Sequence, residues 1–260
     1  KLSLSKCKFF FKQFCKEVVE VDNLESGELI KLINNSYRDL SFAFSNQVAM
    51  ICSKYNLDTN KIIRSANKNY PRNQIAKPSP GVGGPCLTKD PYILEESIQK
   101  RQDKSLFSIS RDINNKIVDE LIKKIVNKLK GKIKKNLLIC GLAFKGYPQT
   151  KDYRGSVSLI FFEKLSKIKN LNVKLHDPLF SPKEIKRLLN VGSEDFKKNS
   201  NFYDCIIILN NNTYYKKLNY QKYCKILKNN ALIYDYWSLI NKSKLKKIKK
   251  IKDKVEYINL

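Results

Sequence analysis

The chain has 260 residues, and its 51 Lys and Arg against 24 Asp and Glu give a formal net charge of +27. At roughly 100–200 residues per domain, this length predicts one large domain or two modest ones. Hydrophobic residues make up 42% of the chain, which argues against the disorder that so high a charge could indicate. No apolar run approaches the roughly 20 residues of a membrane span, and no signal peptide is visible. We therefore exclude an integral membrane protein and expect a cytoplasmic one.

The positive charge raises the question of nucleic acid as a partner. The excess is mostly Lys, spread along the chain beside many Ile, Asn and Tyr, with local runs such as Lys244 to Lys250. That distribution is typical of a compositional bias, and the chain has neither zinc-finger spacing nor an RNP-type aromatic motif. Nucleic acid is thus disfavoured, and attraction to phosphorylated small molecules is an equally good use of the same field.

The pattern of the seven cysteines predicts neither a disulfide framework nor a metal site. Their number is odd, their spacing is wide and no CxxC occurs, so reduced thiols and no bound metal are expected. Cys86 is exceptional because it follows the glycine-rich loop Pro80-Gly81-Val82-Gly83-Gly84-Pro85. A loop of this kind allows close approach of another molecule to the backbone.

The first half of the chain reads as mostly helical. Apolar positions close to the 3.6-residue period predict a long helix over 25–56 and another from about Ser108 to Leu129, ended by Gly131. A shorter helix is expected from Thr59 to Ala66. The glycine-rich loop occupies 78–88, and Asp90-Pro91 resembles an N-cap followed by proline at the first helical position.

The second half alternates short apolar runs with helical or turn segments. Strands are expected at 137–140, 173–176, 205–209 and 231–234, with a helix from about Ser156 to Lys167. Continuous apolar strands alternating with helices predict a parallel sheet covered on both faces. This half therefore reads as an α/β nucleotide-binding type of domain, with its ligand at the carboxyl ends of the strands.

Several residues could carry chemistry, but each also has a structural explanation. A helix that begins directly after Cys86 would favour the thiolate, yet the same loop could hold an inert cysteine. Lys31 and Asn35 share one helix face and could stabilise an oxyanion, whereas spacing alone favours a solvated face. Asp90 could simply cap its helix. In the other half, Lys145 and Arg154 flank the turn where phosphate would bind, in a chain rich in basic residues, and His176 reads as structural.

Three motifs resemble the UDP-glucose/GDP-mannose dehydrogenase family. Residues 25–38, ESGELIKLINNSYR, look like the family's central-helix motif, and residues 81–92, GVGGPCLTKDPY, resemble its catalytic-cysteine loop. Gly141-Leu142-Ala143-Phe144-Lys145, followed by Asp152, Arg154 and Ser156, is similar to the start of its UDP-binding domain. The surroundings of Arg72 and Pro80 look closer to UDP-N-acetylhexosamine dehydrogenases than to UDP-glucose dehydrogenases.

The resemblance implies an NAD-dependent, four-electron oxidation of a nucleotide-sugar C6 alcohol to a carboxylate, for surface polysaccharide precursors. By family role, Cys86 would form a thiohemiacetal and then a thioester, Lys31 and Asn35 would steady oxyanions, and Asp90 would position or activate water. Lys145, Gly83 and Gly84 would bind the substrate, and Arg72 would contact the substrate of a neighbouring subunit. Arg154 and Lys89 would lie on the cofactor side.

The resemblance also implies an α/β architecture in three parts. These are a remnant of the NAD-binding domain (1–22), a helical central or dimerisation domain (23–130) and a Rossmann-like UDP-sugar-binding domain (131–260). Phe9 to Lys16 look like the last helix of the NAD-binding domain and Val18 to Val21 like its closing strand. The long helix would form a homodimer.

Two departures leave two hypotheses open. The chain has no G-x-G-x-x-G turn, and Tyr236-Trp237 stands where many relatives place a substrate-gripping arginine. One hypothesis is a nucleotide-sugar 6-dehydrogenase whose NAD domain was cut off, is supplied in trans or was lost, and which is inactive alone. The other is a non-catalytic module for nucleotide-sugar binding or oligomerisation.

Overall fold

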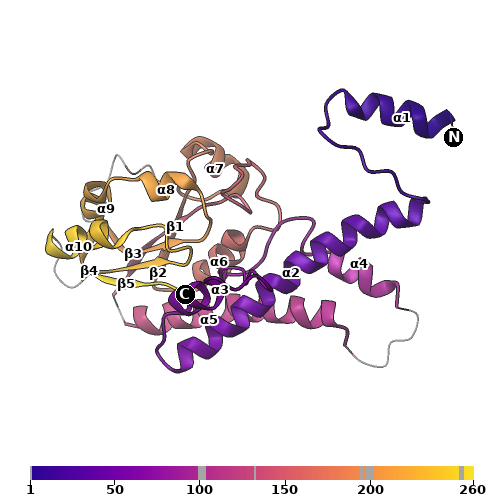
Figure 1. Cartoon of the computed structure of the whole chain (residues 1–260). Helices are drawn as coiled ribbons and strands as arrows, with labels where there is room; N and C mark the ends of the chain where they lie inside the picture. Colours follow the sequence, from indigo (N-terminus) through magenta and orange to yellow (C-terminus); the bar gives the residue numbers. More distant parts are fainter. Residues whose placement is uncertain (1, 99–103, 132, 194–195, 197–201, 252–254) are drawn as a thin grey trace.

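The computed structural model describes residues 2–98, 104–131, 133–193, 196, 202–251 and 255–260, and it consists of a helical part followed by an α/β part (Figure 1). The helical part comprises α1 (Leu2–Lys12), α2 (Leu24–Lys54), α3 (Thr59–Asn67), α4 (Asp90–Glu96) and α5 (Leu106–Leu129). The α/β part comprises β1 (Lys135–Cys140), α6 (Val157–Ser166), β2 (Leu171–His176), α7 (Pro182–Leu189), β3 (Tyr203–Ile208), α8 (Thr213–Lys217), α9 (Tyr220–Ile226), β4 (Leu227–Asp235), α10 (Lys242–Ile251) and β5 (Glu256–Ile258). The predicted fold class is confirmed.

The sheet is parallel throughout, with strand order β2-β1-β3-β4-β5. Successive strand residues point to opposite faces, so each strand contributes to two cores. Leu137, Ile139 and Ile207 pack with α5 and α6 on one face, whereas Leu138 and Ile206 pack with α8, α9 and α10 on the other. Burial on both faces explains why the strands are continuous apolar runs rather than alternating ones.

Helix α5 connects the two parts. Ser110, Arg111 and Asn114 in its first half are buried, and α5 packs along α2. From Ile117 to Leu129 its apolar residues join the core on one face of the sheet. One continuous helix therefore contributes to the packing of both the helical part and the sheet.

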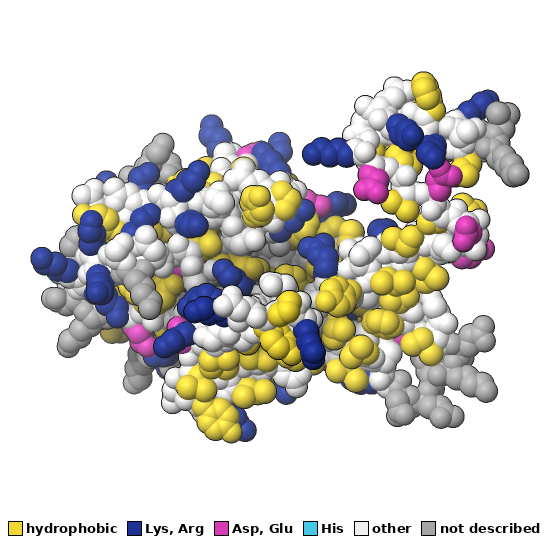
Figure 2. All heavy atoms as spheres, viewed as in Figure 1, with side chains coloured by type: hydrophobic (Ala, Val, Ile, Leu, Met, Phe, Trp, Pro, Cys, Tyr) yellow, Lys and Arg dark blue, Asp and Glu magenta, His cyan; other side chains and the backbone are white. Residues whose placement is uncertain are grey.

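Helix α2 buries an unusual face. Its N-cap Asn23 accepts a hydrogen bond from the Ser26 amide at 2.8 Å, which accounts for its start. The buried positions are small or polar: Ser36, Asp39, Ala43, Ser45, Asn46, Ala49 and Cys52. The apolar residues that predicted the helix lie largely outside, with Tyr37 68% exposed and Phe44 55% exposed. Figure 2 shows such apolar side chains gathered over the helical part.

Three details differ from the expectations. Helix α1 ends at Lys12, and residues 18–21 form no strand because, in the described chain, no neighbouring strand pairs with them. Asp90 is not the N-cap of α4 but its first helical residue, and Lys89 occupies the cap position without a capping hydrogen bond. Strand β5, which was not expected, pairs with β4 at the sheet edge.

No helix among the described residues is long and apolar enough to cross a membrane.

Candidate functional site

The glycine-rich loop lies between the helical part and the loop that follows β1. The Gly84 amide donates to the Gly155 carbonyl at 2.9 Å, which joins the two loops directly. A Cβ on Gly83 would lie 2.3 Å from the Gly155 oxygen, and one on Gly84 would lie 2.6 Å from the Phe144 ring. Gly84 also has a φ of +96°, so side chains are excluded at both positions. The glycines therefore permit close contact between the two parts of the chain.

Asp90 is the centre of a polar cluster. Its carboxylate has no exposed surface, and it accepts hydrogen bonds from Asn35 Nδ2 at 2.6 Å and from Lys89 Nζ at 2.8 Å. Lys31 Nζ lies 3.8 Å from the same carboxylate. Burial raises the pKa of Asp90, but the hydrogen bonds from Lys89 and Asn35 and the charge of Lys31 together lower it below its usual value. Lys31, Asn35, Lys89 and Asp90 are thus brought together as an ionised carboxylate with its donors.

Cys86 lies beside this cluster and is exposed. The Asp90 amide donates to the Cys86 carbonyl at 2.9 Å, so the cysteine is attached to the first turn of α4. The hydrogen bond and charge of Asp90 are the main causes that raise the pKa of Lys89, and Cys86 adds a smaller contribution of the same sign. The pKa of Arg154 is raised in the same way, mainly by the hydrogen bond and charge of Asp152 and to a smaller extent by Cys86. The thiol is therefore within electrostatic range of two cations.

Lys145 and Arg154 lie on the loop that contacts Gly83 and Gly84. Lys145 Nζ lies 5.4 Å from the centroid of the neighbouring Phe144 ring, which also contacts Gly84. Arg154 is paired with Asp152 through Nη2 at 2.7 Å and is 74% exposed. These two cations and the cysteine loop thus belong to one junction, although no hydrogen bond of the described chain joins them to Cys86.

Two predicted residues lie outside this junction. Arg72 is exposed in the segment after α3, and the described chain shows no bond from it to the cluster. His176 is buried, with Nδ1 3.0 Å from the Tyr215 hydroxyl, in agreement with the expected structural role.

A buried polar network behind the cysteine loop was missed by the sequence analysis. Arg111 Nη1 lies 2.6 Å from Asp39 Oδ1, and both side chains are almost fully buried. Asn114 donates to the same carboxylate oxygen at 2.9 Å, and Asn46 donates to Asn114 at 2.9 Å. One signal was available: Asp39 follows Asn35 by four positions, on the helix face already singled out for Lys31 and Asn35.

The described residues do not form a dinucleotide site at the carboxyl edge of the sheet. Asp177, just after β2, accepts hydrogen bonds from the Leu142 and Ala143 amides at 2.8 and 3.1 Å. Those amides follow β1, where a Rossmann fold presents donors to a pyrophosphate. Asn210 lies so close to Gly141 that a Cβ there would be 2.3 Å away. At the turn after β1 the amide donors and the space are both taken, so this turn does not fit the pyrophosphate of NAD.

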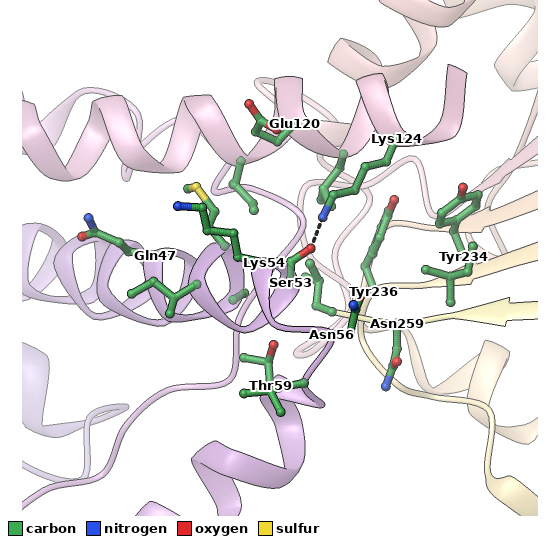
Figure 3. A pocket seen from close by; sticks show the side chains of 18 of the residues that line it. Gln47, Ser53, Lys54, Asn56, Thr59, Glu120, Lys124, Tyr234, Tyr236 and Asn259 are labelled. Atoms are coloured by element: carbon green, nitrogen blue, oxygen red, sulfur yellow. Dashed lines mark hydrogen bonds between the residues drawn. The ribbon is translucent and has the colours of Figure 1, made fainter. Parts of the chain in front are cut away.

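A cavity of about 590 Å³ lies elsewhere, between the C-terminal half of α2, α5 and the end of β4 (Figure 3). Its lining includes Lys54, Lys124, Tyr234 and Tyr236, and none of the predicted site residues. Lys124 Nζ donates to Ser53 Oγ across it at 2.6 Å. Within the described part of the chain, no group of three or more His, Cys, Asp and Glu could hold a metal ion.

Comparisons with known proteins match both parts of the chain. The central-domain description of the UDP-glucose/GDP-mannose dehydrogenase family matches residues 25–116, and its UDP-binding-domain description matches residues 138–242. A UDP-N-acetyl-D-mannosamine dehydrogenase from Methanococcus vannielii is 30% identical over 251 residues. The alignment covers 95% of this chain and 56% of that protein.

Solved structures give the same result. The structure of the UDP-N-acetyl-mannosamine dehydrogenase Cap5O from Staphylococcus aureus superposes with a TM-score of 0.77 and 26% identity, covering 100% of this chain and 56% of that one. The UDP-D-ManNAc dehydrogenase from Pyrococcus horikoshii superposes with a TM-score of 0.75 and 25% identity, covering 100% and 57%. The chain thus spans a little over half the length of these relatives.

Proposed function

Because the chain belongs to the UDP-glucose/GDP-mannose dehydrogenase family, we propose that it carries the catalytic thiol and the sugar-nucleotide-binding part of a UDP-N-acetylmannosamine dehydrogenase. The observation that carries the proposal is the cluster around Cys86. An exposed thiol lies just before α4, next to an ionised carboxylate that accepts hydrogen bonds from Asn35 and Lys89 and is also near the Lys31 amine. This cluster lies at the junction with a domain of the UDP-binding type. The names of the relatives favour the N-acetylmannosamine form of the substrate.

The proposed role of Cys86 is to hold the sugar during its second oxidation. The thiolate sulfur adds to the C6 aldehyde carbon and forms a thiohemiacetal, whose oxygen carries the developing negative charge. The thiohemiacetal then loses its C6 hydride to the hydride acceptor and its hydroxyl proton to solvent, which leaves the thioester. Water attacks the same carbon, the C–S bond breaks, and one proton of the water passes to the leaving sulfur and the other to solvent, so that the carboxylate and the Cys86 thiol are released. Lys31 and Asn35 are the donors assigned to the negative oxygen in both additions.

Asp90 is assigned to positioning water rather than to removing its proton. A carboxylate whose pKa is lowered by Lys89, Asn35 and Lys31 against the opposing effect of burial is a weaker base than a free one. It remains a good hydrogen-bond acceptor at neutral pH.

Oxidation of an alcohol to a carboxylate releases two hydrides, and family members use two molecules of NAD to accept them. Since the turn after β1 does not fit the pyrophosphate of NAD, we assign NAD binding to a part of the enzyme that this chain does not provide. On this account the chain alone produces no NADH from any UDP-sugar. A non-catalytic module predicts the same result, so the two readings differ only when an NAD domain is supplied.

We further propose a homodimer formed through α2. Exposed apolar residues recur every seven positions along it: Ile30, Tyr37, Phe44 and Ile51. A stripe with this period suits packing against another helix, and a 31-residue helix offers a long contact. In a dimer, Arg72 of each subunit could contact the substrate of the other, which is the role expected for it.

The test combines the chain with a separately produced NAD-binding domain from the Methanococcus vannielii relative. With UDP-N-acetylmannosamine and NAD, we expect two NADH per uronate formed, and no uronate from a Cys86→Ser variant. Cys15→Ser is the matched control, because Cys15 is also an exposed thiol but lies far along the chain from the loop. Unchanged turnover in Cys86→Ser would refute the assigned role.

A further inference from the structure

The glycine-rich loop runs along one face of α2 and is attached to it at both ends. At one end, the Ser79 amide donates to Asn46 Oδ1 at 2.8 Å. At the other end, Asn35 donates to the Asp90 carboxylate at 2.6 Å. Asn35, Asp39 and Asn46 are spaced by four and seven residues, so they lie on the same side of the helix. Cys86 lies on the stretch of chain between these two attachments.

The middle of the loop is held by buried side chains rather than by regular secondary structure. Ser79 Oγ donates to the Gly81 carbonyl at 3.0 Å, and Arg111 donates to the Val82 carbonyl from Nη1 at 3.4 Å and from Nη2 at 3.3 Å. Arg111 is in turn oriented by Asp39, and Asp39 by Asn114. Every carbonyl named here belongs to the turn directly before Gly83 and Gly84, where the two parts of the chain meet.

Stability does not explain why an ion pair occupies this place. Asp39 Oδ2 and Arg111 Nε have no hydrogen-bond partner in the described chain, so the buried charges are only partly satisfied. Burial raises the pKa of Asp39 despite the opposing effects of Arg111 and Asn114, which means that the ionised carboxylate is costly here. Buried pairs of this kind can often be replaced by apolar residues without loss of stability.

We propose that Asp39 and Arg111 are positioning residues that fix the turn at Val82 and thereby place Cys86 against the Asp90 cluster and Arg154. The inference deepens the proposed function, because positioning of this thiol matters to catalysis only if Cys86 is the nucleophile. Asp39 fixes the guanidinium, the guanidinium fixes the Val82 carbonyl, and the fixed turn allows Gly84 to bond Gly155. In the described chain, the hydrogen bonds of the Asp39 and Arg111 side chains go neither to Cys86 nor to Asp90.

The test uses the full chain and needs no enzymatic activity. Cys86 alkylation is followed by mass spectrometry with anionic iodoacetate and with neutral iodoacetamide, and exposed Cys7 and Cys15 in the same molecule serve as internal references. The ratio of the two rates reports the positive field around each thiol, because the cations attract only the anionic reagent. Hydrogen exchange of the Gly84 amide reports its bond to Gly155.

Three variants separate positioning from folding. In Asp39→Leu/Arg111→Met the ion pair is replaced by apolar residues, and we expect an unfolding midpoint within about 3 °C of the parent chain. The Cys86 reagent ratio should fall at least about threefold and Gly84 exchange should accelerate at least about tenfold. Arg111→Lys keeps the charge opposite Asp39 but loses the two guanidinium donors to the Val82 carbonyl. We therefore expect the same fall in the Cys86 reagent ratio and the same acceleration of Gly84 exchange. Asp235→Asn, which changes a buried carboxyl that bonds the Ile240 amide and the Tyr257 hydroxyl, should change neither.

A Cys86 ratio and Gly84 exchange that match the parent chain in Arg111→Lys would overturn the proposal, even if the double variant failed to fold. A uniform acceleration of exchange throughout α5 and the sheet would also overturn it, since that is the effect of lost stability alone. Failure of the proposed function is distinguishable, because it would show as absent uronate formation while the alkylation and exchange results remained as expected here.

Discussion

At the scale of single residues, the charge state of Asp90 shows how the site is prepared before any substrate binds. Two segments far apart in sequence supply its partners, Asn35 and Lys31 from α2 and Lys89 from the loop. Their combined effect outweighs burial and leaves the pKa of Asp90 below its usual value. The folded state therefore favours the carboxylate, and the fold and the charge at the site are linked.

This linkage predicts a pH dependence of stability for Asp90→Asn. A lowered pKa means that ionised Asp90 stabilises the fold above its ordinary pKa of about 4, and that this contribution is lost as the pH falls through the lower folded value. We expect Asp90→Asn to cost on the order of 1 kcal/mol at pH 7, since the exposed Lys89 partner is screened by solvent. Urea unfolding at pH 7 and pH 3 checks this. A cost that is equal at both values would contradict it.

Tyr236, which lines the cavity, gives the opposite kind of prediction. The Tyr236 hydroxyl is buried and has no hydrogen-bond partner in the described chain, so its removal should relieve a desolvation cost. We expect Tyr236→Phe to leave the free energy of unfolding unchanged or raise it by up to about 1 kcal/mol. The control is Tyr215→Phe, because the Tyr215 hydroxyl donates to the His176 carbonyl at 3.0 Å and its loss should destabilise. Equal losses of the free energy of unfolding in both variants would refute the claim that the Tyr236 hydroxyl is buried at a cost.

At the scale of elements, the glycine-rich loop and α2 were foreseen to different degrees. The loop could be predicted because Gly83, Gly84 and Cys86 form a local motif. The orientation of α2 could not, since its apolar period resembles that of a helix packed on a core. In fact Asp39 and Asn46 face inward and Tyr37 and Phe44 face outward. The inward face depends on partners such as Arg111 and Ser79, more than thirty residues away, which periodicity does not reveal.

The tight packing of the loop predicts a strong effect of one added methyl group. A Cβ on Gly83 would lie 2.3 Å from the backbone oxygen of Gly155, which cannot move without displacing that loop. We expect Gly83→Ala to destabilise by about 1–3 kcal/mol, as overpacking does. Gly27→Ala is the matched control: it lies in α2 with its nearest neighbour at 3.7 Å, and it should stabilise by about 0.5–1 kcal/mol. Thermal unfolding of both variants distinguishes them, and a neutral Gly83→Ala would count against the described junction.

At the scale of the whole molecule, the fold class and the order of the two parts followed from the sequence. Continuous apolar runs separated by helical segments predicted the parallel sheet, because strands buried on both faces must be apolar throughout. Strand β5 was not expected and a strand at 18–21 was expected wrongly, since strand formation depends on whether a neighbouring strand is present. The high positive charge has a limited part in the site, where Lys31, Lys89, Lys145 and Arg154 lie at the junction.

The proposed dimer leads to a prediction for the intact chain. Phe44 is 55% exposed and lies at the middle of the apolar stripe on α2. We expect Phe44→Asp to shift the chain from dimer to monomer in analytical ultracentrifugation, because the charge would be buried unpaired in the contact. Ile62→Asp is the control, since Ile62 is an exposed apolar residue on α3, away from the stripe. A parent chain that sediments as a monomer at micromolar concentration would contradict the dimer.

The most direct test of the account uses the aldehyde intermediate itself. The C6 aldehyde of UDP-N-acetylmannosamine is incubated with the chain, and alkylation of each exposed cysteine is followed by mass spectrometry. Formation of a thiohemiacetal predicts that Cys86 is protected in proportion to aldehyde occupancy, that Cys7 and Cys15 react at their usual rates, and that the corresponding alcohol protects far less. Alkylation of Cys86 at an undiminished rate at millimolar aldehyde would contradict the central claim that this thiol receives the sugar.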